Sequence, residues 1–267
     1  EPTQPAEPVQ IGCGHEDTTD RSSLAAIEWE QVVGEVTCDA TQFDCNGLAC
    51  SSGSSPLFDR SLNSLFMTSS GVMLAGAADY HNSNCRTFSG TILRSVDNGR
   101  HWEVRSRNLA LSPGSFGVRG FAEAPDGTLF AATQQGVYTS LNAGVDWNRM
   151  VFSEPLASKT IASVGVTPSG NYLLVGTRGP NSGHKGELHR VKRSDLGSEL
   201  LFDDTGGHWG VVSIQNCGES STYVATDGDG RGKLRRSDDP DGSDWKVLVN
   251  GVNIHSLSVN KSCVAYA

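Results

Sequence analysis

The chain has 267 residues, with 21 Lys and Arg against 30 Asp and Glu, which gives a net charge of −9 at pH 7. This acidic balance, without a visible basic stripe, argues against a nucleic-acid partner, and no stretch approaches the roughly 20 apolar residues of a membrane span. The 31 glycines and the scarcity of helix-period apolar runs instead predict an all-β protein with many tight turns.

Residues 1–12 form a Pro-rich polar segment that we expect to be extended or disordered. The segment resembles the stalk of a mature protein whose export signal has been removed, and a trimmed chain is the alternative. We therefore expect a single domain over residues 13–267 of a secreted, periplasmic or cell-surface protein.

The cysteines support the same location. Three of the seven, Cys38, Cys45 and Cys50, fall in a polar loop that we interpret as an insertion at about 36–59. The chain has no CxxC pair of the kind that binds zinc, so this spacing favours disulfides in an oxidising compartment. The odd count leaves one thiol free or paired elsewhere, and the spacing alone does not give the connectivity.

Four consecutive segments repeat one pattern: an apolar strand, a turn, a second strand, a loop, a Gly-led third strand, a turn and a fourth strand. The expected second strands are 71–76, 127–132, 170–175 and 222–226, and the expected third strands are 90–95, 136–140, 186–190 and 232–237.

The turn after the third strand carries a motif, S-x-D-x-G-x-x-W, which in the first repeat runs from Ser95 to Trp102. Asp97 can accept hydrogen bonds from backbone N–H groups ahead of it, and Gly99 can adopt the positive φ of a tight return. Trp102 can then fold its ring over the hairpin. Related turns contain Ser140, Asn142, Gly144 and Trp147 in the second repeat, and Ser237, Asp239, Gly242 and Trp245 in the fourth.

The spacing of these tryptophans predicts the fold. Trp102 and Trp147 are 45 residues apart, and Trp147 and Trp245 are 98 apart, which is twice 49, because the third repeat lacks the tryptophan. A period of this length is typical of β-propeller blades made of four antiparallel strands.

The two ends of the chain suggest how the ring closes. Residues 254–259 and 263–267 look like the first two strands of another blade, and residues 27–33 look like a fourth strand. Joining them would give five blades, one of them composite, and would remove exposed sheet edges. The alternative is a truncated chain with further blades. In the composite blade, Cys13 and Cys263 could form a disulfide.

The repeated motif resembles the Asp-box, or BNR repeat, of propellers such as sialidases and sortilin-type receptors, and the resemblance covers about residues 60–250. It implies that the box residues are structural and lie at the periphery, away from the ligand-binding face. It implies a fold and does not by itself identify a function.

In such a ring the opposite face is built from the loops between second and third strands and from the connections between blades. These loops supply polar, aromatic and charged side chains suited to a glycan or peptide, and ordinary solvated loops are the alternative reading. The candidate binding residues are Tyr80, His81, Arg86, Arg178, His184 and Arg231.

We expect no cofactor. Calcium is the metal ion that the sequence could bind. Asp227 and Asp229 lie two residues apart around a glycine, which clusters the oxygen ligands that Ca²⁺ prefers. The carboxylates of Asp239 and Asp241 are already explained by the turn motif.

The sequence favours an exported, non-catalytic propeller that acts as a binding or assembly module for a protein or glycan, and that could be a subunit of a larger exported or surface assembly. The alternative is a carbohydrate-active hydrolase of Asp-box type. Sialidases use three arginines and an Arg-Ile-Pro motif and have more blades than five. The chain has no Arg-Ile-Pro, and Arg60, Arg119 and Arg178 form a triad only by selection.

Overall fold

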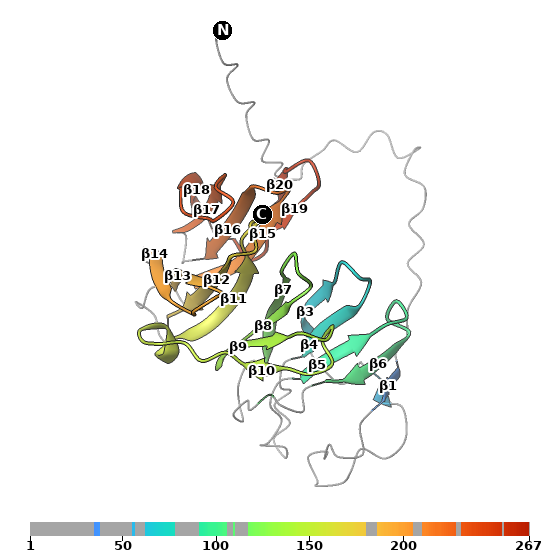
Figure 1. The fold of residues 1–267 in the computed structure, drawn as a ribbon. Coiled ribbons are helices and arrows are strands. Elements are labelled where there is room, and N and C mark those ends of the chain that lie inside the picture. The colour runs from blue at the N-terminus through green and yellow to red at the C-terminus, as the bar shows by residue number, and fades with distance from the viewer. Residues whose placement is uncertain are drawn as a thin grey trace, which may run out of the picture.

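The computed structural model describes residues 35–37, 55–56, 62–77, 91–105, 109, 117–179, 186–204, 210–227, 231–252 and 254–266. These residues form an all-β structure in which four-stranded antiparallel sheets follow one another as propeller blades (Figure 1). The short 3-10 turn η2 (Leu156–Ser158) interrupts the connection between two blades. The predicted all-β fold of four-stranded antiparallel sheets is therefore confirmed, and the number of blades stays a prediction.

Each blade consists of four consecutive strands, hydrogen-bonded in sequence order. Blade 1 contains β3 (Leu62–Met67), β4 (Met73–Ala77), β5 (Thr91–Ser95) and β6 (His101–Val104), and blade 2 contains β7 (Val118–Glu123), β8 (Leu129–Thr133), β9 (Gly136–Ser140) and β10 (Asn148–Arg149). Blade 3 contains β11 (Thr160–Val166), β12 (Tyr172–Arg178), β13 (Gly186–Lys192) and β14 (Ser198–Asp204), and blade 4 contains β15 (Gly210–Cys217), β16 (Ser221–Asp227), β17 (Gly232–Ser237) and β18 (Trp245–Val252).

Four further short strands flank these blades. At the edge of blade 1, β1 (Glu35–Thr37) pairs in parallel with β6, and β2 (Ser55–Pro56) pairs with β1. After blade 4, β19 (Ser258–Val259) and β20 (Ala265–Tyr266) pair antiparallel where the sequence predicted the start of another blade. Residues 27–33 lie outside the described residues, so the five-bladed ring stays a prediction.

The disulfide connectivity differs from the pairing suggested above. Cys263 is bonded to Cys217 at the end of β15, with 5.4 Å between the two Cα atoms. Since the β19–β20 hairpin packs beside blade 4 and the Tyr223 hydroxyl donates a hydrogen bond to the Cys263 carbonyl, Cys263 faces β15 and the proposed pairing with Cys13 is wrong. The other cysteines lie outside the described residues.

The first strands of successive blades pack against each other through equivalent positions. Each first strand has a β-bulge near its start. The residues two positions after the bulged residue are equivalent in blades 2, 3 and 4, and their side chains are 9%, 4% and 8% exposed in Phe121, Val164 and Ile214, respectively. The Phe121 ring, for example, lies 6.3 Å from that of Phe66 in the preceding blade. Leu65 occupies the same position in blade 1 and is 63% exposed. This side of blade 1 is therefore largely open to solvent.

Candidate functional site

The turn from Ser95 to Trp102 is closed by hydrogen bonds among the motif residues. The Ser95 hydroxyl donates to Asp97 Oδ1 over 2.8 Å and accepts from the N–H of Gly99 over 2.9 Å. Asp97 Oδ1 also accepts the N–H of His101, and Trp102 Nε1 donates to the Gly99 carbonyl over 2.8 Å. Gly99 has φ of 84°. These hydrogen bonds lower the pKa of Asp97, chiefly through the His101 N–H.

Two other turns repeat this geometry. In blade 2, Asn142 Oδ1 accepts the N–H of Asp146 over 2.9 Å, and Trp147 Nε1 donates to the Gly144 carbonyl over 3.2 Å. In blade 4, Trp245 Nε1 donates to the Gly242 carbonyl over 2.9 Å.

Blade 3 lacks this turn for a visible reason. The register places Val191 opposite Ser198, whereas blade 4 places Ser237 opposite Trp245. Blade 3 therefore has neither the hydroxyl nor the indole at the corresponding positions.

The described residues of the predicted binding face are Arg178 and Arg231. Arg178 ends β12, Arg231 is exposed just before β17, and both lie at loops between second and third strands. Burial, followed by the positive charge of Arg178, lowers the pKa of Arg119 to about 10. Tyr80, His81, Arg86 and His184 lie outside the described residues, as does Arg60.

The predicted calcium ligands are described in part. Asp227 is buried at the end of β16, and its Oδ2 lies 3.2 Å from His255 Nδ1. Asp229 lies outside the described residues. Among the residues that are described, no three His, Cys, Asp or Glu side chains are grouped to hold a metal ion. Calcium binding stays a prediction.

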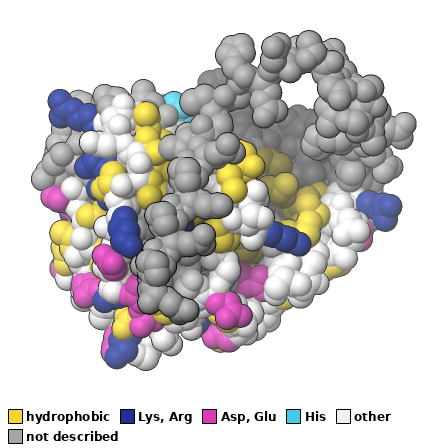
Figure 2. Space-filling view, turned by 90° about the horizontal axis from the view of Figure 1, so that it is seen from above, with side chains coloured by type: hydrophobic (Ala, Val, Ile, Leu, Met, Phe, Trp, Pro, Cys, Tyr) yellow, Lys and Arg dark blue, Asp and Glu magenta, His cyan; other side chains and the backbone are white. Residues whose placement is uncertain are grey.

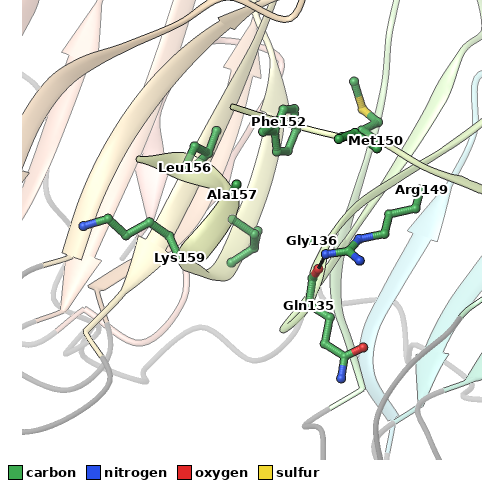
Figure 3. A pocket seen from close by; sticks show the side chains of 10 residues that line it. Gln135, Gly136, Arg149, Met150, Phe152, Leu156, Ala157 and Lys159 are labelled. Atoms are coloured by element: carbon green, nitrogen blue, oxygen red, sulfur yellow. Dashed lines mark hydrogen bonds between the residues drawn. The ribbon is translucent and has the colours of Figure 1, made fainter. Parts of the chain in front are cut away.

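A pocket opens between blades 2 and 3, at the end of the blades where second and third strands are joined (Figure 3). It has a volume of about 130 Å³. It is lined by Gln135, Gly136, Arg149, Met150, Val151, Phe152, Leu156, Ala157, Lys159 and Ile161. Sequence reasoning missed it, although the apolar side chains of the connection from β10 to β11 are unusual for a solvated segment and could have indicated it.

Arg149 is the cation that faces this pocket. Its Nη2 donates to the Gln135 carbonyl over 2.7 Å, and its guanidinium lies over Gly136, where an added Cβ would come within 3.3 Å of Nε. The glycine at the start of β9 therefore leaves the room that Arg149 occupies. Figure 3 shows the Lys159 ammonium pointing away from Arg149.

The Lys159 ammonium instead pairs with a partly buried carboxylate of blade 3. Its Nζ lies 2.6 Å from Glu187 Oε1, and Glu187 Oε2 lies 2.7 Å from Nε2 of the buried His189. Burial raises the pKa of Glu187, but the hydrogen bonds from Lys159 and His189 outweigh it, so the pKa is lowered overall. Glu187 is therefore an ionised carboxylate with both oxygens engaged.

The pKa is also lowered in the other carboxyl groups whose pKa is shifted. Within the described part of the chain, the carboxyl groups with a shifted pKa, all of them lowered, are those of Asp97, Asp126, Glu187, Asp195, Asp238 and Asp239. A glycosidase acid needs the opposite shift.

The exposed charges are mixed in sign. On the face shown in Figure 2, described Lys and Arg side chains are scattered among Asp and Glu. None of the described helical segments is long and apolar enough to cross a membrane.

No protein-family model matches the chain, and no curated protein resembles it in sequence. Solved structures resemble it in fold. An ancestral GH74 enzyme matches with a TM-score of 0.54 and 12% identity over 76% of this chain and 30% of the enzyme. The Dos1 propeller matches with a TM-score of 0.53 and 12% identity over 83% of this chain and 53% of its own.

A putative TolB from Agrobacterium tumefaciens matches with a TM-score of 0.51 and 13% identity, over 82% of this chain and 79% of that one. The chain is thus a β-propeller. At these identities the similarity concerns the fold alone.

Proposed function

We propose that this chain is an exported, non-catalytic propeller that acts as a binding or assembly module for a protein or glycan. The observation that carries the proposal is the pocket between blades 2 and 3, where apolar walls and the guanidinium of Arg149 converge at one end of the ring. Concave sites that combine apolar surface with a few placed polar groups are typical of ligand recognition.

One observation supports binding over hydrolysis, and a second supports export to an oxidising compartment. The carboxyls with shifted pKa values named above are held ionised, which suits structural roles better than proton donation. The Cys217–Cys263 disulfide is of the kind that persists in oxidising compartments.

The proposal includes the finer assignments from the sequence. The S-x-D-x-G-x-x-W turns are those of an Asp-box propeller, and residues 27–33 complete a fifth blade with β19 and β20. The hydrogen bonds of these turns, made within the hairpin, support a structural role for the motif.

The test is to present the purified chain to a glycan panel and to extracts of its native source, and to assay the same glycans for hydrolysis. We expect saturable binding of one glycan or one protein without turnover, weakened by Arg149→Gln and unaffected by Arg100→Gln, an exposed arginine in the Ser95–Trp102 turn. Hydrolysis that a single carboxylate-to-amide substitution abolishes would contradict the proposal.

A further inference from the structure

The apolar part of the inter-blade pocket is formed by core residues. Phe152, Leu156 and Ile161 belong to the hydrophobic cluster between blades 2 and 3, and Met150 packs against the same cluster. The volume of about 130 Å³ is close to the roughly 150 Å³ of an apolar cavity that accepts benzene. The pocket therefore has room for one ring or one branched aliphatic group.

The polar part of the pocket carries a single positive charge. Arg149 is the charged residue whose head group faces the space, and its hydrogen bond goes to the neutral carbonyl of Gln135. The charge of Lys159 is compensated by Glu187, outside the lining. A guanidinium has five N–H donors in a planar arrangement that matches a carboxylate, so Arg149 has donors left for a ligand.

We propose that this pocket binds a carboxylate attached to an apolar group of about one ring in size. Arg149 receives the carboxylate, and Met150, Val151 and Phe152, which keep exposed surface in the lining, contact the apolar group. The inference rests on the proposed function, since it names the chemistry that the binding face recognises. Such a carboxylate can come from a free small acid or from the C-terminal residue of a peptide.

The first arm of the test uses phenylacetate, followed by amide chemical shifts of the whole chain. Acetate supplies the charge without the ring, and phenylacetamide supplies the ring without the charge. We expect shifts at Gln135, Gly136 and Leu156, with acetate and phenylacetamide each about tenfold weaker. Equal affinity for either control would overturn the proposal.

The second arm uses variants. Arg149 is exposed, so Arg149→Gln should fold normally, and we expect about tenfold weaker phenylacetate binding. Arg100→Gln is the matched control and should leave the affinity unchanged. An unchanged affinity in Arg149→Gln, or shifts that lie away from the pocket, would overturn the assignment.

The third arm separates the two sources. Acetyl-Gly-Phe with a free C-terminus is compared with its C-terminal amide and with phenylacetate. Tighter binding of the free peptide acid than of phenylacetate assigns the site to a protein C-terminus, and weaker binding assigns it to a small acid. If none binds, the pocket proposal fails, while a partner found in the glycan and extract screen would leave the proposed function standing.

Discussion

Arg94 in β5 donates a hydrogen bond from Nε to the carbonyl oxygen of Ala143, 2.8 Å away in the turn of the next blade. Arg190 in β13 does the same to the carbonyl of Asp241 in the turn of blade 4, over 3.0 Å. Both arginines stand at the same position of the third strand. The turns with the S-x-D-x-G-x-x-W motif therefore join successive blades as well as closing their own hairpins.

The junction between blades 2 and 3 lacks both halves of this contact. Thr139 stands where the other blades have arginine, and the facing turn of blade 3 has lost the motif. Here Arg193 crosses over the ring of Phe130, 5.4 Å from its centroid, and donates to Asp126 over 2.7 Å. At this junction, the third-strand arginine of blade 2 and the turn of blade 3 that would accept its hydrogen bond are thus both absent.

Gly144→Ala tests the fit of the turn against the preceding blade. Gly144 has φ of +81°, and an added Cβ would lie 2.8 Å from Leu74 Cδ2. We expect the free energy of unfolding to fall by about 2–4 kcal/mol, from the positive φ and the overlap together. Gly71→Ala, with φ of +83° and open space around it, should cost only about 1–2 kcal/mol. Equal losses in urea titrations would show that the overlap relaxes freely.

Asp97 should tolerate asparagine better than alanine. An amide oxygen can accept the same N–H bonds, as Asn142 does in blade 2. We expect Asp97→Ala to lower the melting temperature clearly and Asp97→Asn to lower it less, with ligand binding per folded molecule unchanged in both. Loss of binding at an unchanged melting temperature would instead place Asp97 in the binding site.

Phe121→Ala and Leu65→Ala compare equivalent positions in two blades. Because Phe121 is buried against Phe66, its truncation should cost about 3–5 kcal/mol. Leu65 is mostly exposed, so its truncation should change stability by no more than about 0.5 kcal/mol. A large loss in Leu65→Ala, measured by the same unfolding assay, would mean that another element covers this side of blade 1 in solution.

Glu187→Gln should make stability less sensitive to acid. The pKa of Glu187 is lowered in the folded state, so its contribution is full above its unfolded value of 4.5 and is lost as pH falls through the folded-state pKa. We expect the variant to be about 2 kcal/mol less stable at pH 7, with a gap to the parent chain that narrows below pH 4.5. Glu219→Gln, in an exposed turn, should show neither effect in denaturant titrations across this range.

Removal of the disulfide should destabilise the end of blade 4. Cys217 and Cys263 are 46 residues apart, and a loop of this length corresponds to about 4 kcal/mol in the chain-entropy model. We expect the double serine variant to lose up to this amount and to exchange the amide protons of residues 254–266 faster. Unchanged stability and exchange, with the disulfide confirmed in the parent by mass spectrometry, would contradict its structural role.

Local patterns made part of the fold predictable. The predicted strands 71–76 and 232–237 correspond to β4 and β17, because alternating apolar residues and glycine turns act over a few neighbouring positions. The motif also indicated which residues would close each hairpin. The pocket was not predicted, because Gly136 and Phe152 meet only through the packing of two blades.

The sequence by itself determined the kind of strand, the spacing of the turns and the repetition that makes a propeller. The tertiary structure decided which groups meet between separate sheets: Cys217 with Cys263, Arg94 with Ala143, and Arg190 with Asp241. The reason is physical. Strand and turn preferences depend on neighbouring residues, whereas contacts across blades depend on how far each sheet turns relative to the one before it, which no short stretch of sequence encodes.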